Sequence, residues 1–332
     1  MLALRTSTDT TKEWFLDVSY KPAQTQKEIS EQMTETNINN TNTNPTLLNP
    51  DSDVFFPVHV SPVFSQDNPD GGFHMKSPDY KMIKRTDTGR ELGIHKMGYT
   101  LVRNEDLFGC IEQELINNLD PVVMDHVEVS DTQSYGGAVC SRQYNFPTIK
   151  RNIYTTSGHI SPIHMRAIGV NCFDGSMKAK IIFGNIDAYC TNGLISGVFE
   201  VIAKKRTSGF TIKSMKDRLT VSMSNFEKEM DTYEKWAMQR VVTFKVEEFF
   251  KTVASEARAK KLMEQYHEEL AVRGANIWSV VSAMTNYSSH NSERFGVRNT
   301  GNDNEAKTLL DRQVEVNRWI GSKAFGSLLQ AA

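Results

Sequence analysis

The chain has 332 residues, of which 39% are hydrophobic and 23% are charged, and its formal net charge is −2. No stretch approaches the roughly 18 uninterrupted apolar residues of a membrane-spanning helix, and the first residues lack the apolar core and cleavage site of a secretory signal. We therefore expect a cytoplasmic protein without a membrane partner. Four widely spaced cysteines without a C-x-x-C pair argue against a zinc knuckle and a disulfide scaffold.

The first 80 residues are predicted to contain little packed structure. Residues 22–53 are rich in Asn, Thr and Gln and almost lack large apolar side chains, so burial cannot offset the entropy cost of ordering them. We expect residues 1–54 to form a flexible tail. Residues 55–80 contain four prolines and the turn signal NPDGG, which favours a loop-rich entry segment.

Residues 81–225 are predicted to form an α+β core. Apolar residues recur at four-residue steps from Leu107 to Leu119, which predicts a helix of about four turns. The hydrophobic period then becomes that of strands at 122–130 and 138–146, joined through a polar turn. We expect an antiparallel sheet of hairpins with a flanking helix.

The segment FDGSMKAKIIFGNIDAYCTNG, residues 173–193, is predicted to continue this sheet. Asp174-Gly175 favours a two-residue hairpin turn. After this turn apolar and polar residues alternate, so one strand face is expected to be core. The other face should carry Lys178 and Lys180 into solvent.

The last third of the chain, residues 226–332, is predicted to be mostly helical and to pack on the core. Phe226, Met230, Tyr233 and Ala237 follow the helical period. Three further helices are predicted at 249–270, 277–284 and 305–330. A helix, a run of antiparallel strands and then helices place the chain in the α+β class.

Four segments carry motifs in an order that resembles one family. They are RTDTGRELGIHKMGYTLVRNEDLFGCIEQEL, the hairpin NCFDGSMKAK, the turn AYCTNGL and the late helix NIWSVVSAMTNYSSHNSERFG. These segments are similar to the family catalogued as domain of unknown function 932, with Ser282 where that family usually has Asn. The resemblance covers roughly residues 85–326. It implies a phage or mobile-element origin, hence the host cytoplasm, and no particular activity.

The candidate catalytic and metal-binding residues form no complete motif. Glu264 and His267 have the E-x-x-H spacing of di-iron bundles without a second copy, and a solvated helix face is the alternative. His159 and His164 lie close together without the G-x-S-x-G elbow of a hydrolase. Cys190 would need a base that the sequence cannot place. We expect no catalytic residue, no metal and no cofactor, and favour a binding protein over an enzyme.

Positive charge concentrates in residues 142–220, where twelve Lys and Arg outnumber four Asp and Glu, a net charge of +8. Such a regional excess is typical of a surface that binds a polyanion. Arg142, Tyr144 and Phe146 share one face of a predicted strand, and cations interleaved with aromatic rings suit single-stranded nucleic acid. The alternative is that the two rings belong to the core.

The resulting hypothesis is a protein that binds single-stranded nucleic acid. The predicted site, which we call the basic strip, consists of Arg142, Tyr144, Lys150, Arg151, Arg166, Lys178, Lys180, Lys204, Lys205, Arg206 and Lys213. Helices on one face of an antiparallel sheet leave the other face for such a ligand. At the level of fold alone, this layout resembles the Rad52-like strand-annealing proteins of phages, which form oligomeric rings.

Single-stranded DNA and further copies of the chain are therefore the expected partners, and recombination is the expected process. The alternative is a structural or host-takeover protein without enzymatic activity. In that case the basic sheet would contact an acidic protein partner.

Overall fold

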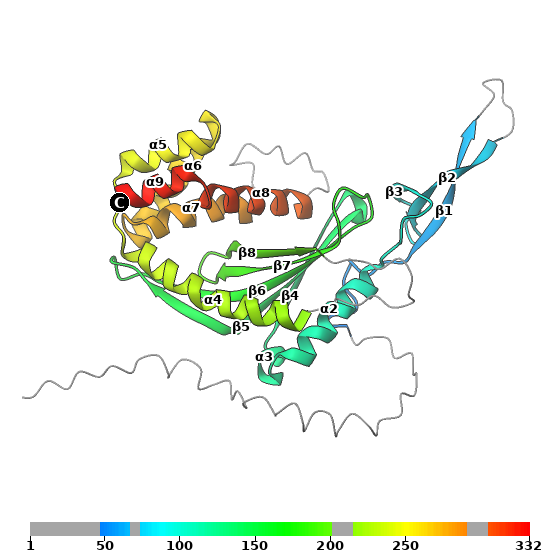
Figure 1. Ribbon diagram of the computed structural model, residues 1–332, viewed down its shortest axis with the longest axis horizontal. Coiled ribbons are helices and arrows are strands. Elements are labelled where there is room, and N and C mark those ends of the chain that lie inside the picture. The colour runs from blue at the N-terminus through cyan, green and yellow to red at the C-terminus, as the bar shows by residue number, and fades with distance from the viewer. Residues whose placement is uncertain (1–46, 67–73, 201–214, 291–304) are drawn as a thin grey trace, which may run out of the picture.

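The computed structural model describes residues 47–66, 74–200, 215–290 and 305–332. These residues form a body with a narrow arm at one end (Figure 1). The body contains a five-stranded antiparallel sheet and helices, and the arm is a separate three-stranded antiparallel sheet. The predicted α+β class is confirmed.

The arm consists of β1 (Val58–Gln66), β2 (His74–Arg85) and β3 (Glu91–Lys96), paired in that order. Its base is fixed to the body. Ile83 is fully buried, and His95 Nε2 lies 2.6 Å from the carbonyl oxygen of Phe173 in the body. Gly93 approaches this loop so closely that an added Cβ would lie 2.4 Å from the same oxygen, so a glycine is required there.

The body sheet is a meander of β4 (Glu128–Ser134), β5 (Val139–Tyr154), β6 (Ile160–Cys172), β7 (Lys180–Asp187) and β8 (Asn192–Glu200). A short 3₁₀ turn, Tyr135–Gly137, connects β4 to β5. The central strands are buried on both faces, because Ile181 belongs to the main hydrophobic cluster and the adjacent Ile182 to a second one. Strands covered on both faces are expected to be nearly continuous apolar runs, as β7 is.

Two helices, α2 (Asn104–Asn118) and α3 (Pro121–Asp125), precede the body sheet. After it, the described residues form α4 (Met215–Met238), α5 (Thr243–Val253), α6 (Glu256–Arg273), α7 (Ile277–Ser289), α8 (Glu305–Ile320) and α9 (Lys323–Ala331). Helices α2 and α4 cover one face of the sheet, where Phe108 and Ile111 of α2 pack over Gly169. Helix α8 covers part of the other face, where Leu310 packs with Ile168.

The boundaries predicted for the N-terminal segments are wrong. Residues 1–46 lie outside the described residues, but 47–54 pack on the body, with Val54 buried. Residues 55–80, predicted to be loops, contain β1 and the first half of β2. Pro62 of the outer strand β1 and Pro78 of the middle strand β2 both lie at the register shift between Pro62 and Phe64, where regular pairing is interrupted and a missing N–H is tolerated.

The two-residue hairpin predicted at Asp174-Gly175 is also wrong. Strand β6 ends at Cys172 and β7 begins at Lys180, so residues 173–179 form a longer connection. This connection is longer because it packs on β3 of the arm, where Gly175 has a positive φ of 74° and lies beside His95.

The helical C-terminal third is confirmed, and the apolar stripe predicted from Phe226 to Ala237 is buried on α4. The helix predicted at 249–270 is divided into α5 and α6, and the one predicted at 305–330 breaks at Gly321 between α8 and α9. No helix within the described ranges is long and apolar enough to cross a membrane.

Candidate functional site

Arg142 and Tyr144 of the basic strip are fully buried, because their face of β5 packs against α2. Arg142 donates from Nε to Glu112 at 2.7 Å and from Nη1 to Asp131 at 2.6 Å. The Tyr144 hydroxyl donates to Glu112 at 3.0 Å. The predicted contact of these two residues with nucleic acid is wrong, since α2 supplies both a cover and the counter-charge.

The same network holds the residues that precede the arm. The Leu48 N–H donates to Glu112 at 2.7 Å, Arg142 donates to the Leu48 carbonyl, and the Ser52 hydroxyl donates to Asp131 at 2.5 Å. Burial raises the pKa of Glu112 and of Asp131. Two buried carboxylates depend on one guanidinium, so Arg142 has a structural role.

Arg166 is buried on the opposite face of the body sheet, where it is 3% exposed. It donates to Gln143 at 2.8 Å and to Gln313 of α8 at 3.1 Å. Burial lowers the pKa of Arg166 to about 10, so the guanidinium remains charged at neutral pH. Helix α8 therefore occupies part of the face that was predicted to be free for a ligand.

Arg151 lies at the surface but is surrounded by acids of α4. Its guanidinium is 3.4 Å from Glu227, 2.8 Å from Asp231 and 2.9 Å from Glu234. A cation that faces three carboxylates offers no net positive charge to a polyanion.

The other described members of the basic strip do not lie together. Lys150 is exposed opposite His164 on β6, and Lys180 lies opposite Val170. His164 and Val170 are six residues apart on β6, so the two lysines are separated by roughly 20 Å along the strand direction. Lys178 lies in the connection before β7. The remaining members, Lys204, Lys205, Arg206 and Lys213, lie outside the described residues. Among the described residues the basic strip is not a continuous surface.

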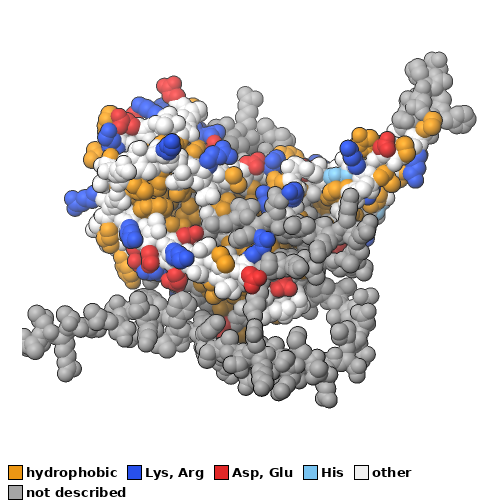
Figure 2. Space-filling model, in the orientation of Figure 1, with side chains coloured by type: hydrophobic (Ala, Val, Ile, Leu, Met, Phe, Trp, Pro, Cys, Tyr) orange, Lys and Arg blue, Asp and Glu red, His pale blue; other side chains and the backbone are white. Residues whose placement is uncertain are grey.

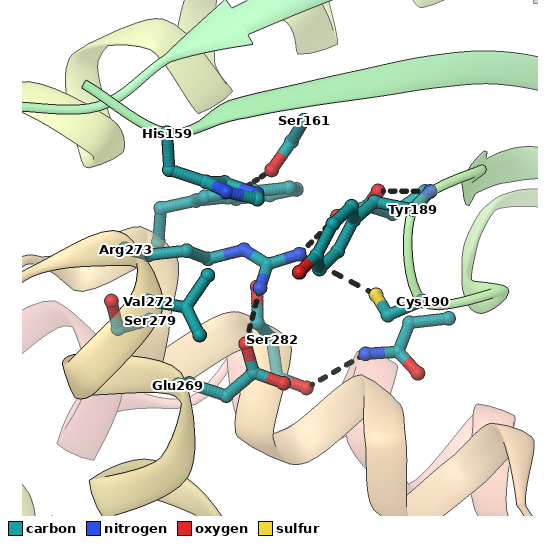
Figure 3. A network of polar contacts seen from close by, with 12 residues as sticks. His159, Ser161, Tyr189, Cys190, Glu269, Val272, Arg273, Ser279 and Ser282 are labelled. Carbon is teal, nitrogen blue, oxygen red and sulfur yellow. Dashed lines mark hydrogen bonds and ion pairs between the residues drawn. The ribbon is translucent and has the colours of Figure 1, made fainter. Parts of the chain in front are cut away.

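Another buried arginine network lies where β7 meets α6 (Figure 3). Arg273 of α6 is 1% exposed and donates to Asp187 at 2.7 Å and to Glu269 at 2.5 Å. Its guanidinium lies 5.5 Å from the ring centre of Tyr189, and Nη2 lies 3.5 Å from the sulfur of Cys190. Arg273 thus joins α6 to the turn between β7 and β8.

The CTNG turn and the late helix, both part of the family resemblance, meet beside this network. The Asn192 side-chain amide donates to the Ser282 carbonyl at 3.2 Å, and the Gly193 N–H donates to the Ser289 hydroxyl at 2.8 Å. His290 Nε2 lies 3.1 Å from Asn192 Oδ1. Two sequence motifs that are far apart in the chain therefore form one packed unit.

This unit has the residue types of a catalytic site without the space or the reactivity. Asp187, Asn192 and Ser282 line a cavity of about 10 Å³, which is near the lower limit for one water molecule. Burial raises the pKa of Cys190 to about 12, so the thiol is protonated and weakly nucleophilic at neutral pH. Burial also lowers the pKa of His159. Within the residues that the structure describes, the network joins elements around a cavity that is too small for a substrate.

The candidate metal ligands do not form one group, because Glu264 and His267 are neighbours on one helix whereas His164 lies on another element. Glu264 and His267 are exposed on α6, whereas His164 is half-buried on β6. In the part of the chain that the structure describes, no three His, Cys, Asp or Glu side chains form a group that could hold a metal ion.

The outer face of the arm has the residue pattern that the basic strip lacks. We use this name for the sheet face that carries His59, Ser61, Tyr80, Met82, Lys84, Ile94 and Lys96. Tyr80 lies opposite Lys96, and Lys84 lies opposite His59. Tyr80 is 45% exposed and Lys96 is also exposed. The reverse face carries Ile83 and the other groups that contact the body.

A second aromatic–lysine pair lies farther out on the arm. Phe64 of β1 is 55% exposed and lies opposite Lys76 of β2, which is also exposed. Directly opposite residues have Cβ atoms about 4.5–5.5 Å apart. Figure 2 shows hydrophobic side chains next to Lys and Arg along the arm. Within the described residues, neither Lys76 nor Lys96 forms an ion pair.

Sequence reasoning missed the arm because the prolines and the NPDGG turn between 55 and 80 favoured loops. One signal could have revealed it. Lys76, Tyr80, Met82 and Lys84 share the two-residue period of a strand, which predicts that they lie on one side of β2.

The family model described as Domain of unknown function (DUF932) matches residues 91–314, about two thirds of the chain. The match begins at the first residue of β3 and includes the body sheet, so β1 and β2 of the arm lie outside it. No curated protein and no solved structure matches the chain.

Proposed function

This chain belongs to the DUF932 family, and we propose that it binds nucleic acid through two aromatic–lysine pairs of its arm, one on the outer face and one beyond the register shift. The supporting observation is that exposed aromatic rings pair with lysines across the strands, Tyr80 with Lys96 and Phe64 with Lys76. Lysines bind phosphates without reading sequence, and aromatic rings stack on bases.

The charge of the arm favours a polyanion. Along β2, Lys76 and Lys84 each lie four residues from Tyr80, which is opposite Lys96, so the three lysines follow one another at intervals of roughly 13 Å along the strand. Glu91 lies opposite Lys84 in the register and offsets one of these charges. The remaining ammonium groups are exposed to solvent, so the release of counterions from phosphates favours binding.

The biological setting that we propose is a phage or mobile element, in which the protein anneals or protects nucleic-acid strands during recombination. The family resemblance and the arm support this setting. An assembly of several copies would place several arms along one strand and would increase the apparent affinity.

An acidic protein partner is the second candidate. Tyr80 and Ile94 are 45% and 59% exposed and lie on one face of the arm at adjacent register positions, and exposed apolar residues that lie close together are typical of protein-binding surfaces. The lysines of the arm would then meet carboxylates in place of phosphates.

Fluorescence anisotropy of a labelled single-stranded oligonucleotide tests the proposed function. We expect micromolar or tighter binding at low salt that weakens as salt increases. Lys96→Glu should weaken binding about tenfold, because it replaces an attractive phosphate contact by a repulsive one. The matched control is Lys323→Glu, an exposed lysine at the start of α9, which should bind as the wild type does. Absence of binding at low salt would exclude the proposed function and favour the protein partner.

A further inference from the structure

We infer that the arm selects a single strand over a duplex, and that bases of this strand stack on Tyr80 and Phe64. The inference rests on the proposed function, because it names the form of nucleic acid that the arm recognises. Tyr80 is 45% exposed and Phe64 is 55% exposed. Exposed rings of this kind can stack with any unpaired base.

Each ring has a cation beside it. Tyr80 lies opposite Lys96, and Phe64 lies opposite Lys76. A nucleotide needs both groups, since its base stacks while its phosphate is neutralised. The two aromatic–lysine pairs therefore provide two similar places at which one nucleotide can bind.

The two pairs are close enough to hold one short oligonucleotide. Lys76 and Tyr80 are four residues apart on β2, and four residues span at most about 14 Å. The register shift between Pro62 and Phe64, where a step of two residues on β1 matches a step of five on β2, separates the pairs and interrupts the alternation of faces. Such a shift bends and twists the arm locally, so the bound nucleic acid is expected to bend around the arm between the two stacked bases.

A duplex would lose the stacking contribution. Its bases are stacked on one another and paired, so the rings of the arm reach only the terminal base pairs. A duplex can still be bound weakly through its phosphates, or more tightly by a β-ribbon inserted into the major groove, where side chains read the hydrogen-bonding edges of the bases. Phe64 and Ile94 are exposed but have no hydrogen-bonding groups for such edges, and the arm therefore favours stacking.

The test compares one labelled oligonucleotide of mixed sequence, as a single strand and as its duplex, by fluorescence anisotropy. The variants are Tyr80→Leu and Phe64→Leu in the full chain. The matched control is Tyr154→Leu, whose ring is 49% exposed on the body. Each arm variant should bind the single strand about fivefold or more weakly, with unchanged duplex binding and an unchanged melting temperature. The control should bind both forms as the wild type does.

The outcomes separate the inference from the proposed function. Equal wild-type affinity for both forms, together with no effect of Tyr80→Leu or Phe64→Leu, would overturn base stacking. If Lys96→Glu still weakened binding in that case, the arm would remain a nucleic-acid site that recognises phosphates alone. If the wild type bound neither the single strand nor the duplex, the inference and the proposed function would both be overturned.

Discussion

Strand β5 and the arm carry the same kind of residue pattern in different surroundings. On β5, Arg142 and Tyr144 are fully buried under α2 and bonded to Glu112. On the arm, Tyr80 and Lys96 lie side by side on a face exposed to solvent. A cation next to an aromatic ring on a strand is therefore compatible with a core network or with a binding surface.

The two regions differ in whether a helix covers the strand face, and not in the residue pattern of the strand. The face of β5 is covered by a helix whose acid neutralises the cation, so the network stabilises the fold. The outer face of the arm carries an acid only opposite Lys84 within the described residues. The comparison predicts that substitutions on β5 change stability and that substitutions on the arm change binding.

The largest expected effect is the loss of stability in Arg142→Met. This substitution leaves Glu112 and Asp131 buried without their cation, and breaking a buried pair in this way costs about 3–5 kcal/mol. Chemical denaturation measures the loss. The fraction that remains folded should bind nucleic acid as the wild type does. An Arg142→Met protein that is as stable as the wild type but binds nucleic acid more weakly would contradict the comparison, because β5 would then be the binding surface.

A smaller effect is expected in the salt dependence of binding. Two lysines, Lys76 and Lys96, that neutralise phosphates of a single strand predict a slope of log K against log salt of about −1.4. Lys76→Ala/Lys96→Ala should bring the slope close to zero and change the free energy of unfolding by less than about 0.5 kcal/mol. Anisotropy titrations at four salt concentrations give the slope. An unchanged slope in the double variant would mean that the phosphates bind to residues other than these lysines.

The smallest effect concerns the base of the arm, where Arg85 donates twice to Asp87, at 2.9 and 2.6 Å. The hydrogen bonds from Arg85 lower the pKa of Asp87 to about 2. Because the folded pKa is below the unfolded value, this pair stabilises the fold at neutral pH and its contribution is lost as pH falls from about 4 to about 2.

Asp87→Asn should remove this part of the pH dependence. Its side chain is 37% exposed, so solvent screening limits the contribution to about 1 kcal/mol or less. Thermal unfolding between pH 2 and pH 7 measures the difference between the variant and the wild type. Parallel stability curves for the two proteins would mean that the pair contributes no pH dependence.

Much of the fold could be predicted from the sequence because local periodicity determines it. The buried stripe from Phe226 to Ala237 repeats with the helical period, and helix formation needs only that one face is apolar. The strands of the body were predicted for a similar reason, except that the first residues of the strand predicted at 122–130 form α3 and β4 begins only at Glu128. The helix that covers the second face of this sheet was not predicted, because α8 follows β8 by more than a hundred residues.

The site could not be predicted from the sequence, because burial of a cation depends on distant partners. Arg142 is neutralised by Glu112, which lies 30 residues earlier in the chain, and Arg166 is held by Gln313, which lies 147 residues later. No local pattern contains these contacts. The arm was missed for the opposite reason, since local proline signals suggested loops where an outer strand tolerates them.

The most direct test of the arm compares two charge-reversal variants in one anisotropy experiment with a labelled single strand. Lys76→Glu/Lys96→Glu changes the arm, and Lys150→Glu changes an exposed lysine of the basic strip. We expect the arm variant to bind at least about tenfold more weakly at low salt and Lys150→Glu to bind as the wild type does. Normal binding by the arm variant, with loss of binding in Lys150→Glu, would contradict the arm as the interface.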